Sequence, residues 1–263
     1  MKKLYVGTNT KMYKTPSAAV EHVLKLRELT RDIAQQLELF VIPSYTSIAP
    51  CVQAVGEDIL IGAQNMGWED EGQYTGEISA PMLEEVGVRL VMIGHSERRH
   101  VLHETDEEEQ KKIACEARHD FKILLCVGET AQQKSYEISR ETLAQQLKIG
   151  LHGLDAEIAL HRLWIAYEPV WAIGVNGVPA DEHYASEMHR HIKAVLEELY
   201  GDQGREIPVL YGGSVNNENA VKLIAQPYID GLFIGRSAWS AENFNQIIRE
   251  ILPVFRSRDL AEK

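Results

Sequence analysis

The sequence predicts an α/β protein built as a single (β/α)8 barrel, and three observations support this prediction. The chain has 263 residues and is 44% hydrophobic, which suits one barrel, because that architecture typically needs about 250 residues. Short β-type runs alternate eight times with longer helical patterns. No linker, internal repeat or low-complexity segment interrupts the alternation. Residues 1–263 are therefore expected to form one domain.

The expected strands are short apolar runs. They are Leu4–Thr8, Leu39–Ile42, Leu60–Ala63, Leu90–Ile93, Lys122–Val127, Arg162–Tyr167, Pro208–Tyr211 and Gly231–Ile234. Amphipathic helices are expected between them, for example over Ser17–Gln36, Thr130–His152, Asp181–Tyr200 and Ala241–Val254. Strands that alternate with helices pair in parallel. A doubly wound open sheet is the alternative that this pattern leaves open.

Polar clusters at the ends of the expected strands favour the closed barrel. "NTK" follows the first strand, "QN" the third, "GHSERR" the fourth, "CVGET" the fifth, "YEPVW" the sixth, "YGGS" the seventh and "IGRS" the eighth. In a barrel these strand ends share one rim, and active sites of such folds lie there. A single cluster is typical of a turn, but seven clusters on one rim predict a functional site.

Charge and cysteine content exclude several classes of function. The net charge of −12 argues against nucleic acid and anionic membranes as partners, because both repel an acidic protein. The three cysteines, Cys51, Cys115 and Cys126, show no CxxC spacing, so no disulfide framework is expected and a reducing cytoplasm fits. The apolar run after "MKK" is too short for a signal peptide, and no run approaches 18 apolar residues.

No cofactor or metal is expected from the motifs. The sequence contains no GxGxxG, GxxxxGK[ST] or HExxH pattern. His189 and His191 are two residues apart on an expected helix, so their side chains point to different sides and a metal pair is not expected.

Five segments carry a resemblance to a known family. "NTKM" at Asn9–Met12, "GHSERR", "CVGET", "AYEPVWAIG" and "YGGSV" are similar to segments of the triosephosphate isomerases, in the same order over essentially the whole chain. The resemblance implies a TIM barrel and an aldose–ketose isomerase. Such an enzyme moves a proton between neighbouring carbons of a short sugar phosphate through an enediolate, without a cofactor.

The resemblance also implies roles for individual residues. Glu168 would be the general base, His95 a neutral proton donor, and Lys11 a positive charge beside the enediolate with Asn9 alongside. The sequence context fits, since a carboxylate in a dry pocket is a stronger base. Ser96 is predicted to cap a helix whose N-terminus disfavours the protonated form of His95.

Further residues are assigned by the same resemblance. Gly174, Ser214 and Gly235 would bind the substrate phosphate, with Arg236 beside them. A lid would begin at Pro169, Val170, Trp171, Ala172 and Ile173. Glu97 and Glu129 are expected to hold Lys11 and Arg98 in place, and Cys126 to pack beneath the site. Thr75, in the long loop Gln64–Ser79, would approach the catalytic residues of a partner subunit, which predicts a homodimer.

Departures from the family pattern concern the substrate. Thr10 and Tyr13 replace the Trp and Asn of the family's "NWKMN", and Arg236 replaces a glycine. When the motifs are aligned in order, Pro179 falls at a lid position whose backbone N–H, in the family, bonds to the tyrosine of "YGGS" in the closed lid. Because proline has no backbone N–H, Tyr211 is not expected to hold the lid closed through a hydrogen bond to residue 179.

The segments "NGVPA" and "GLFIGRSAW" resemble the erythrulose-phosphate isomerase branch of the family. The favoured substrate is therefore a tetrulose phosphate (erythrulose phosphate and erythrose 4-phosphate). The alternative is the glycolytic pair, glyceraldehyde 3-phosphate and dihydroxyacetone phosphate.

Two other classes of function stay open at this point. An aldolase-type lyase on the same fold would need a Schiff-base lysine at a strand end, for which Lys11 and Lys122 are the candidates. A non-catalytic sugar-phosphate sensor is the other class, although it would have no use for an intact base and proton donor.

Overall fold

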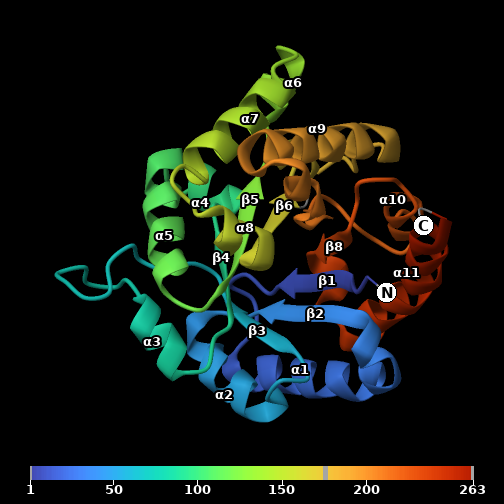
Figure 1. The fold of residues 1–263 in the computed structure, drawn as a ribbon. Helices are drawn as coiled ribbons and strands as arrows, with labels where there is room; N and C mark the ends of the chain where they lie inside the picture. Colours follow the sequence, from blue (N-terminus) through green and yellow to red (C-terminus); the bar gives the residue numbers. More distant parts are fainter. Residues whose placement is uncertain (1, 174–176, 262–263) are drawn as a thin grey trace.

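The computed structural model describes residues 2–173 and 177–261, and its eight strands close into one barrel (Figure 1). The strands are β1 (Leu4–Asn9), β2 (Leu37–Ile42), β3 (Leu60–Ala63), β4 (Leu90–Ile93), β5 (Lys122–Val127), β6 (Leu163–Tyr167), β7 (Val209–Tyr211) and β8 (Gly231–Ile234). Each pairs in parallel with its neighbours, and β1 pairs with both β2 and β8. The barrel prediction is confirmed, and the doubly wound sheet is excluded.

Both faces of the strands are buried, as expected for a parallel sheet covered by helices. Inside the barrel, large rings fill the centre. The rings of Phe40 and Phe233 stack with centroids 5.6 Å apart, and Trp164 lies 5.7 Å from Phe40. Gly7 makes this packing possible, because a Cβ at that position would lie 2.3 Å from the Phe40 ring.

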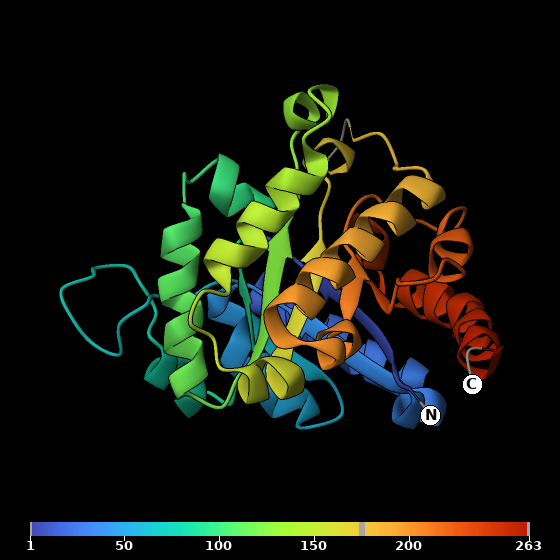
Figure 2. The same ribbon diagram turned by 45° about the horizontal axis from the view of Figure 1, so that its top comes forward.

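Helices surround the barrel (Figures 1 and 2), and their buried apolar residues pack with those of the strands in one core. They are α1 (Pro16–Thr30), α2 (Tyr45–Val55), α3 (Ala80–Glu85), α4 (Ser96–His100), α5 (Asp106–Arg118), α6 (Ala131–Ser135), α7 (Ser139–Gly150), α8 (Ala156–Arg162), α9 (Glu182–Tyr200), α10 (Ala220–Ile224) and α11 (Ala241–Ala261). Short 3-10 helices are η1 (Arg31–Gln36), η2 (Val170–Ala172), η3 (Asp202–Glu206) and η4 (Arg236–Ala238).

Two of the expected helices are divided. The helix predicted over Ser17–Gln36 becomes a 3-10 helix after Thr30. The helix predicted over Thr130–His152 is two helices, α6 and α7, and Glu137 between them has a φ of 61°. A left-handed residue cannot continue an α-helix, and apolar periodicity does not reveal a single such residue.

The strands end at a common rim, where the loops after β1, β4, β6, β7 and β8 contribute to one cavity. The loop between β3 and α3 is different, because it extends away from the barrel in both views (teal in Figures 1 and 2). Among the described residues, no helix combines the length and the apolar character needed to cross a membrane.

Candidate active site

A cavity of about 330 Å³ opens at the carboxyl ends of the strands. Its lining includes Asn9, Lys11, His95, Glu97, Glu168, Ser214, Gly235 and Arg236. The structure therefore brings together residues that the sequence predicted from five separate strand ends. The predicted phosphate ligand Gly174 lies outside the described residues.

A carboxylate and an imidazole face each other in this cavity. Glu168 follows β6 and His95 follows β4, and their side chains are only 4% and 5% exposed. The Nε2 atom of His95 lies 3.4 Å from Oε1 of Glu168, and Oε2 of Glu168 accepts a hydrogen bond of 3.3 Å from the Ser96 amide. The base and the ring are therefore held on the same side of the barrel mouth.

The tautomer of His95 follows from its helix. His95 itself, not Ser96 as predicted, is the N-cap of α4, and its Nδ1 accepts a 3.2 Å hydrogen bond from the Glu97 amide. Burial lowers the pKa of His95, and the charges of Lys11 and Arg98 lower it further, against an opposing effect of Glu168. A neutral ring that accepts at Nδ1 carries its proton on Nε2. The donor thus points towards Glu168.

Glycine neighbours give Glu168 its position. A Cβ at Gly212 would lie 2.9 Å from Cγ of Glu168, and one at Gly128 would lie 1.9 Å from its backbone oxygen. Side chains at these two positions would push the carboxylate out of place. Cys126 is fully buried in the barrel interior, and burial together with Glu168 raises the pKa of its thiol.

Lys11 is held at the rim by a strained backbone and an ion pair. Its φ is 51°, a conformation that non-glycine residues adopt at some energetic cost. The Lys11 amide donates to Oδ1 of Asn9 at 2.7 Å, and its Nζ lies 2.7 Å from Oε1 of Glu97. Gln64 completes the arrangement by donating to Oδ1 of Asn9 and to the Lys11 carbonyl. The role of Gln64 was not assigned from the sequence, although "QN" marked its strand end.

Glu129 has a different role from the one predicted. It makes no ion pair with Arg98, which instead pairs with Glu104 at 2.5 Å. Glu129 accepts hydrogen bonds of 2.8 Å from both Trp171 Nε1 and Tyr184 Oη. Because Trp171 lies at the start of the predicted lid, Glu129 anchors the base of that segment.

An ammonium group completes this anchor. Lys134 Nζ lies 3.3 Å from the ring centroid of Trp171 and 4.4 Å from that of Tyr184, within the range of cation–π attraction. Neither Lys134 nor Tyr184 was predicted, because no strand-end motif contains them.

Two aromatic residues line the active-site cavity together with Lys11. Trp239 and Tyr13 both line the cavity, and their ring centroids are 4.5 Å apart. Trp239 Nε1 donates a 3.0 Å hydrogen bond to the Asn9 carbonyl. Trp239 lies in the quoted "GRSAW" segment, so its sequence neighbourhood, but not its contact, was visible beforehand.

Lys122 lies outside the cavity. It is the first residue of β5, at the opposite end from the rim, and its Nζ donates to the His161 carbonyl. An aldolase-type lyase therefore keeps only Lys11 as a Schiff-base candidate, and Lys11 is paired with Glu97.

Comparison with known proteins decides the family. The family model described as triosephosphate isomerase matches residues 4–251. The chain belongs to the triosephosphate isomerase family. A crystal structure of triosephosphate isomerase from Bartonella henselae is similar, with a TM-score of 0.83 and 34% identity, covering 97% of this chain and 99% of that one.

The chain is similar both to proteins named L-erythrulose-1-phosphate isomerase and to proteins named triosephosphate isomerase. An L-erythrulose-1-phosphate isomerase of Rhizobium etli is 45% identical over 94% of this chain and 92% of the relative. One of Mesorhizobium japonicum is 42% identical over 93% and 95%. A triosephosphate isomerase of Caldanaerobacter subterraneus is 40% identical over 94% and 99%. The protein is an isomerase with the TIM-barrel fold, and the resemblance read from the sequence is confirmed.

Proposed function

We propose that the protein isomerises a phosphorylated four-carbon ketose of the erythrulose phosphate type, with Glu168 as the base and His95 as the proton donor. The observation that carries this proposal is the pair of buried groups 3.4 Å apart in a cavity at the strand ends. Empty space large enough for a short sugar phosphate lies beside that pair.

The chemistry follows from the geometry. Glu168 removes a proton from the carbon next to the substrate carbonyl, and the neutral His95 donates from Nε2 to the carbonyl oxygen, which gives an enediol. Lys11 stabilises the negative charge that develops on the oxygens, and this stabilisation is larger in a water-poor site than in bulk water. Glu168 then returns the proton to the former carbonyl carbon, while the hydroxyl on the other carbon gives its proton to Nε2 of His95 and becomes the new carbonyl. Both side chains are restored, and no oxidant or reductant is consumed.

The position of the phosphate determines which carbons exchange. In a ketose 1-phosphate, C1 carries the phosphoester, so the carbonyl can move only between C2 and C3. In a ketose 4-phosphate, C1 is free, and the carbonyl can also move to C1 to give erythrose 4-phosphate. The same base and donor serve both reactions, because each moves one proton between adjacent carbons.

Phosphate binding is assigned to Ser214, Gly235 and Arg236, with Gly174 outside the described residues. Ser214 and Gly235 line the cavity, and a Cβ at Gly235 would meet no atom within 4 Å, so that backbone is open to a ligand. Arg236 supplies a positive charge that the net charge of −12 makes necessary for an anionic substrate. Hydrogen bonds to a charged phosphate contribute roughly 1.5–3 kcal/mol each.

The choice of a four-carbon substrate rests on the relatives and on the rim. The relatives of 45% and 42% identity are named for L-erythrulose 1-phosphate. Tyr13, Arg236 and Trp239, which line the cavity, lie where this chain departs from the triosephosphate isomerase pattern or matches the erythrulose-phosphate branch.

Side-by-side kinetics test the substrate. We expect kcat/KM for L-erythrulose 1-phosphate to exceed that for glyceraldehyde 3-phosphate at least tenfold. A hundredfold preference for the triose, about 2.7 kcal/mol of transition-state discrimination, would overturn the proposal in favour of the glycolytic reaction.

We also propose that the protein acts as a homodimer in the cytoplasm. Large apolar side chains are exposed in the segments after β1, β3 and β4, namely Met12 (94%), Tyr13 (71%), Tyr74 (46%), Met82 (57%), Val101 (67%) and Leu102 (57%). A contact with a second copy would cover such exposed apolar groups. The cysteines at positions 51, 115 and 126 are free, which fits a reducing compartment.

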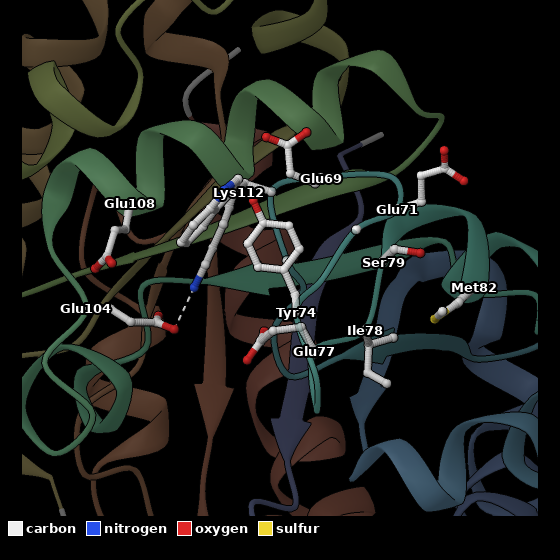
Figure 3. A pocket seen from close by; sticks show the side chains of 13 residues that line it. Glu69, Glu71, Tyr74, Glu77, Ile78, Ser79, Met82, Glu104, Glu108 and Lys112 are labelled. Atoms are coloured by element: carbon white, nitrogen blue, oxygen red, sulfur yellow. Dashed lines mark ion pairs between the residues drawn. The ribbon is translucent and has the colours of Figure 1, made fainter.

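The projecting loop provides the second support for a dimer. It encloses a cavity of about 310 Å³ against α5, lined by Tyr74, Ile78, Met82 and the ion pair of Lys112 with Glu104 (2.6 Å) (Figure 3). Residues 71–77 of this loop are exposed, so the part that carries Thr75 is free to contact a second copy.

Light scattering tests the dimer. The protein is expected to have twice the chain mass at micromolar concentration, and Thr75→Arg to lower both the mass and kcat. A monomeric protein with full activity would contradict the proposal.

A further inference from the structure

Three metal-ligating side chains meet outside the active site. Cys115 lies in the last turn of α5, His119 follows that helix, and Asp70 lies in the loop between β3 and α3. One ligand atom of each of these residues lies within 4.8 Å of those of the other two. These residues take no part in the proposed isomerisation.

The separations are close to those around one metal ion, with the Asp70–His119 contact somewhat shorter. Asp70 Oδ1 lies 3.0 Å from His119 Nε2 and 3.4 Å from Cys115 Sγ. In a tetrahedral zinc site with bonds of about 2.0–2.3 Å, neighbouring ligand atoms are roughly 3.3–3.7 Å apart. We propose that Asp70, Cys115 and His119 bind one divalent transition-metal ion of the zinc class.

A fourth residue supports the assignment by orienting the imidazole. Nδ1 of His119 lies 3.1 Å from Oε2 of Glu84 in α3, while its Nε2 faces Asp70. Metal-binding histidines usually donate their other ring nitrogen to a carboxylate, which fixes the ring and the tautomer. Glu84 is placed to accept from Nδ1 when the ring is in that tautomer, and Nε2 already faces Asp70.

The donor set selects the kind of metal. A thiolate, an imidazole and a carboxylate together suit zinc and similar ions, whereas magnesium and calcium prefer oxygen ligands alone. Asp70 is about half exposed, with 47% of its side chain accessible, so an ion and a water ligand can enter from that side. Cys115 is buried beneath them.

Metal binding must displace protons and one neighbour. Burial raises the pKa of the Cys115 thiol to about 12, so the thiol keeps its proton until a metal replaces it. The ion forms bonds to Sγ and Nε2, the thiol proton goes to solvent, and His119 binds as the neutral ring with its proton on Nδ1, which faces Glu84. Arg118, which lies 3.4 Å from Asp70 Oδ1 with 52% of its side chain exposed, can turn towards solvent.

The ion would connect three elements. Asp70 belongs to the projecting loop, Cys115 and His119 to the end of α5, and Glu84 to α3. Fixing the base of the loop restricts the segment that carries Thr75. A bound ion would therefore stiffen the loop proposed for the dimer contact. The metal-site proposal itself does not depend on the dimer or on the choice of substrate.

Cobalt spectroscopy tests the site on chelator-treated, full-length protein without a histidine tag. Titration with Co²⁺ is expected to produce sulfur-to-cobalt charge-transfer absorption and the intense visible bands of tetrahedral Co²⁺, saturating at one ion per chain. One equivalent of Zn²⁺ should abolish these bands and raise the melting temperature.

Matched variants locate the ion. Cys51→Ser, which alters another buried free cysteine, should leave the bands unchanged, whereas Cys115→Ser should abolish the charge-transfer band. Asp70→Asn, a change at a partly exposed position that keeps the fold testable, should weaken Co²⁺ binding at least tenfold. Absence of charge-transfer absorption in the unmodified protein, or its persistence in Cys115→Ser, would overturn the proposal.

Discussion

Two buried histidines in this protein show what distinguishes a reactive residue from a packed one. Burial lowers the pKa of both, and that of His189 falls to about 3. His95 follows β4 and turns Nε2 towards Glu168 in the cavity. His189 lies on α9, where its ring packs near Tyr167 and Tyr211 and its Nδ1 lies 3.2 Å from the Tyr228 carbonyl. Burial makes both rings neutral, but only His95, at the end of a strand, lies in the cavity where a substrate can bind.

The largest effect on catalysis is expected from replacing Glu168, the base that His95 faces. Glu168→Gln should keep the fold and lower kcat at least a thousandfold, about 4 kcal/mol of transition-state stabilisation, because only the proton acceptor is lost. Steady-state kinetics on erythrulose phosphates measure the effect, and circular dichroism checks the fold. Turnover within tenfold of the unmodified enzyme would remove Glu168 from the mechanism.

Substitution of each histidine should then separate chemistry from packing. His95→Gln should lower kcat at least a hundredfold, about 2.7 kcal/mol, since the proton donor is removed. His189→Asn should change kcat less than threefold while lowering the free energy of unfolding by roughly 1–3 kcal/mol. Kinetics and urea unfolding of the two variants give both quantities. Equal losses of kcat would show that the distinction between the two residues is wrong.

Acid titration should reveal the buried neutral state of His189. Its pKa is about 3 in the folded protein and about 6.5 in the unfolded chain. Between these values the unfolded chain binds the extra proton, so the stability due to this group is complete above pH 6.5 and falls as the pH drops towards 3.

The expected slope is roughly 1 kcal/mol per pH unit below pH 6, and His189→Asn should lack it. Urea unfolding of both proteins at several pH values between 4 and 7 measures the difference. If the two stability curves stay parallel across this range, His189 does not carry the assigned pKa.

A small effect on catalysis is also expected at Tyr211, which packs beside His189. Its hydroxyl makes no hydrogen bond of normal geometry within the described residues, although the Ala180 backbone lies near enough to lower its pKa against the larger effect of burial. Tyr211→Phe should therefore reduce kcat/KM less than tenfold, below about 1.4 kcal/mol. A larger loss would show that the hydroxyl holds the lid closed, with Ala180 in place of Pro179.

The sequence could predict those features of the molecule that depend on local patterns of residues. The strands and the polar clusters at seven of their ends could be read from the sequence, whereas the roles of the cavity residues came from the resemblance to the triosephosphate isomerases. His95 was placed correctly because its cluster follows the fourth expected strand. Its role as N-cap was missed, because serine is the usual cap and a histidine side chain in that position has no sequence signature.

Contacts between distant segments could not be read in this way. Glu129 was expected, with Glu97, to hold Lys11 and Arg98 in place, whereas the fold brings it to Trp171 and Tyr184. Asp70 and Cys115 are 45 residues apart, so no motif search would join them with His119. Such partners are chosen by tertiary packing, which short-range spacing does not encode.

The central claim is that Glu168 takes a proton from a substrate carbon while neutral His95 protonates the carbonyl. Hydrogen exchange from D2O into L-erythrulose 1-phosphate, followed by proton NMR, tests it most directly. The unmodified protein and His189→Asn should introduce deuterium at the exchanging carbon, while Glu168→Gln should introduce none above the uncatalysed rate. Deuterium incorporation by Glu168→Gln at the unmodified rate, or none by the unmodified protein with any erythrulose or triose phosphate, would contradict the claim.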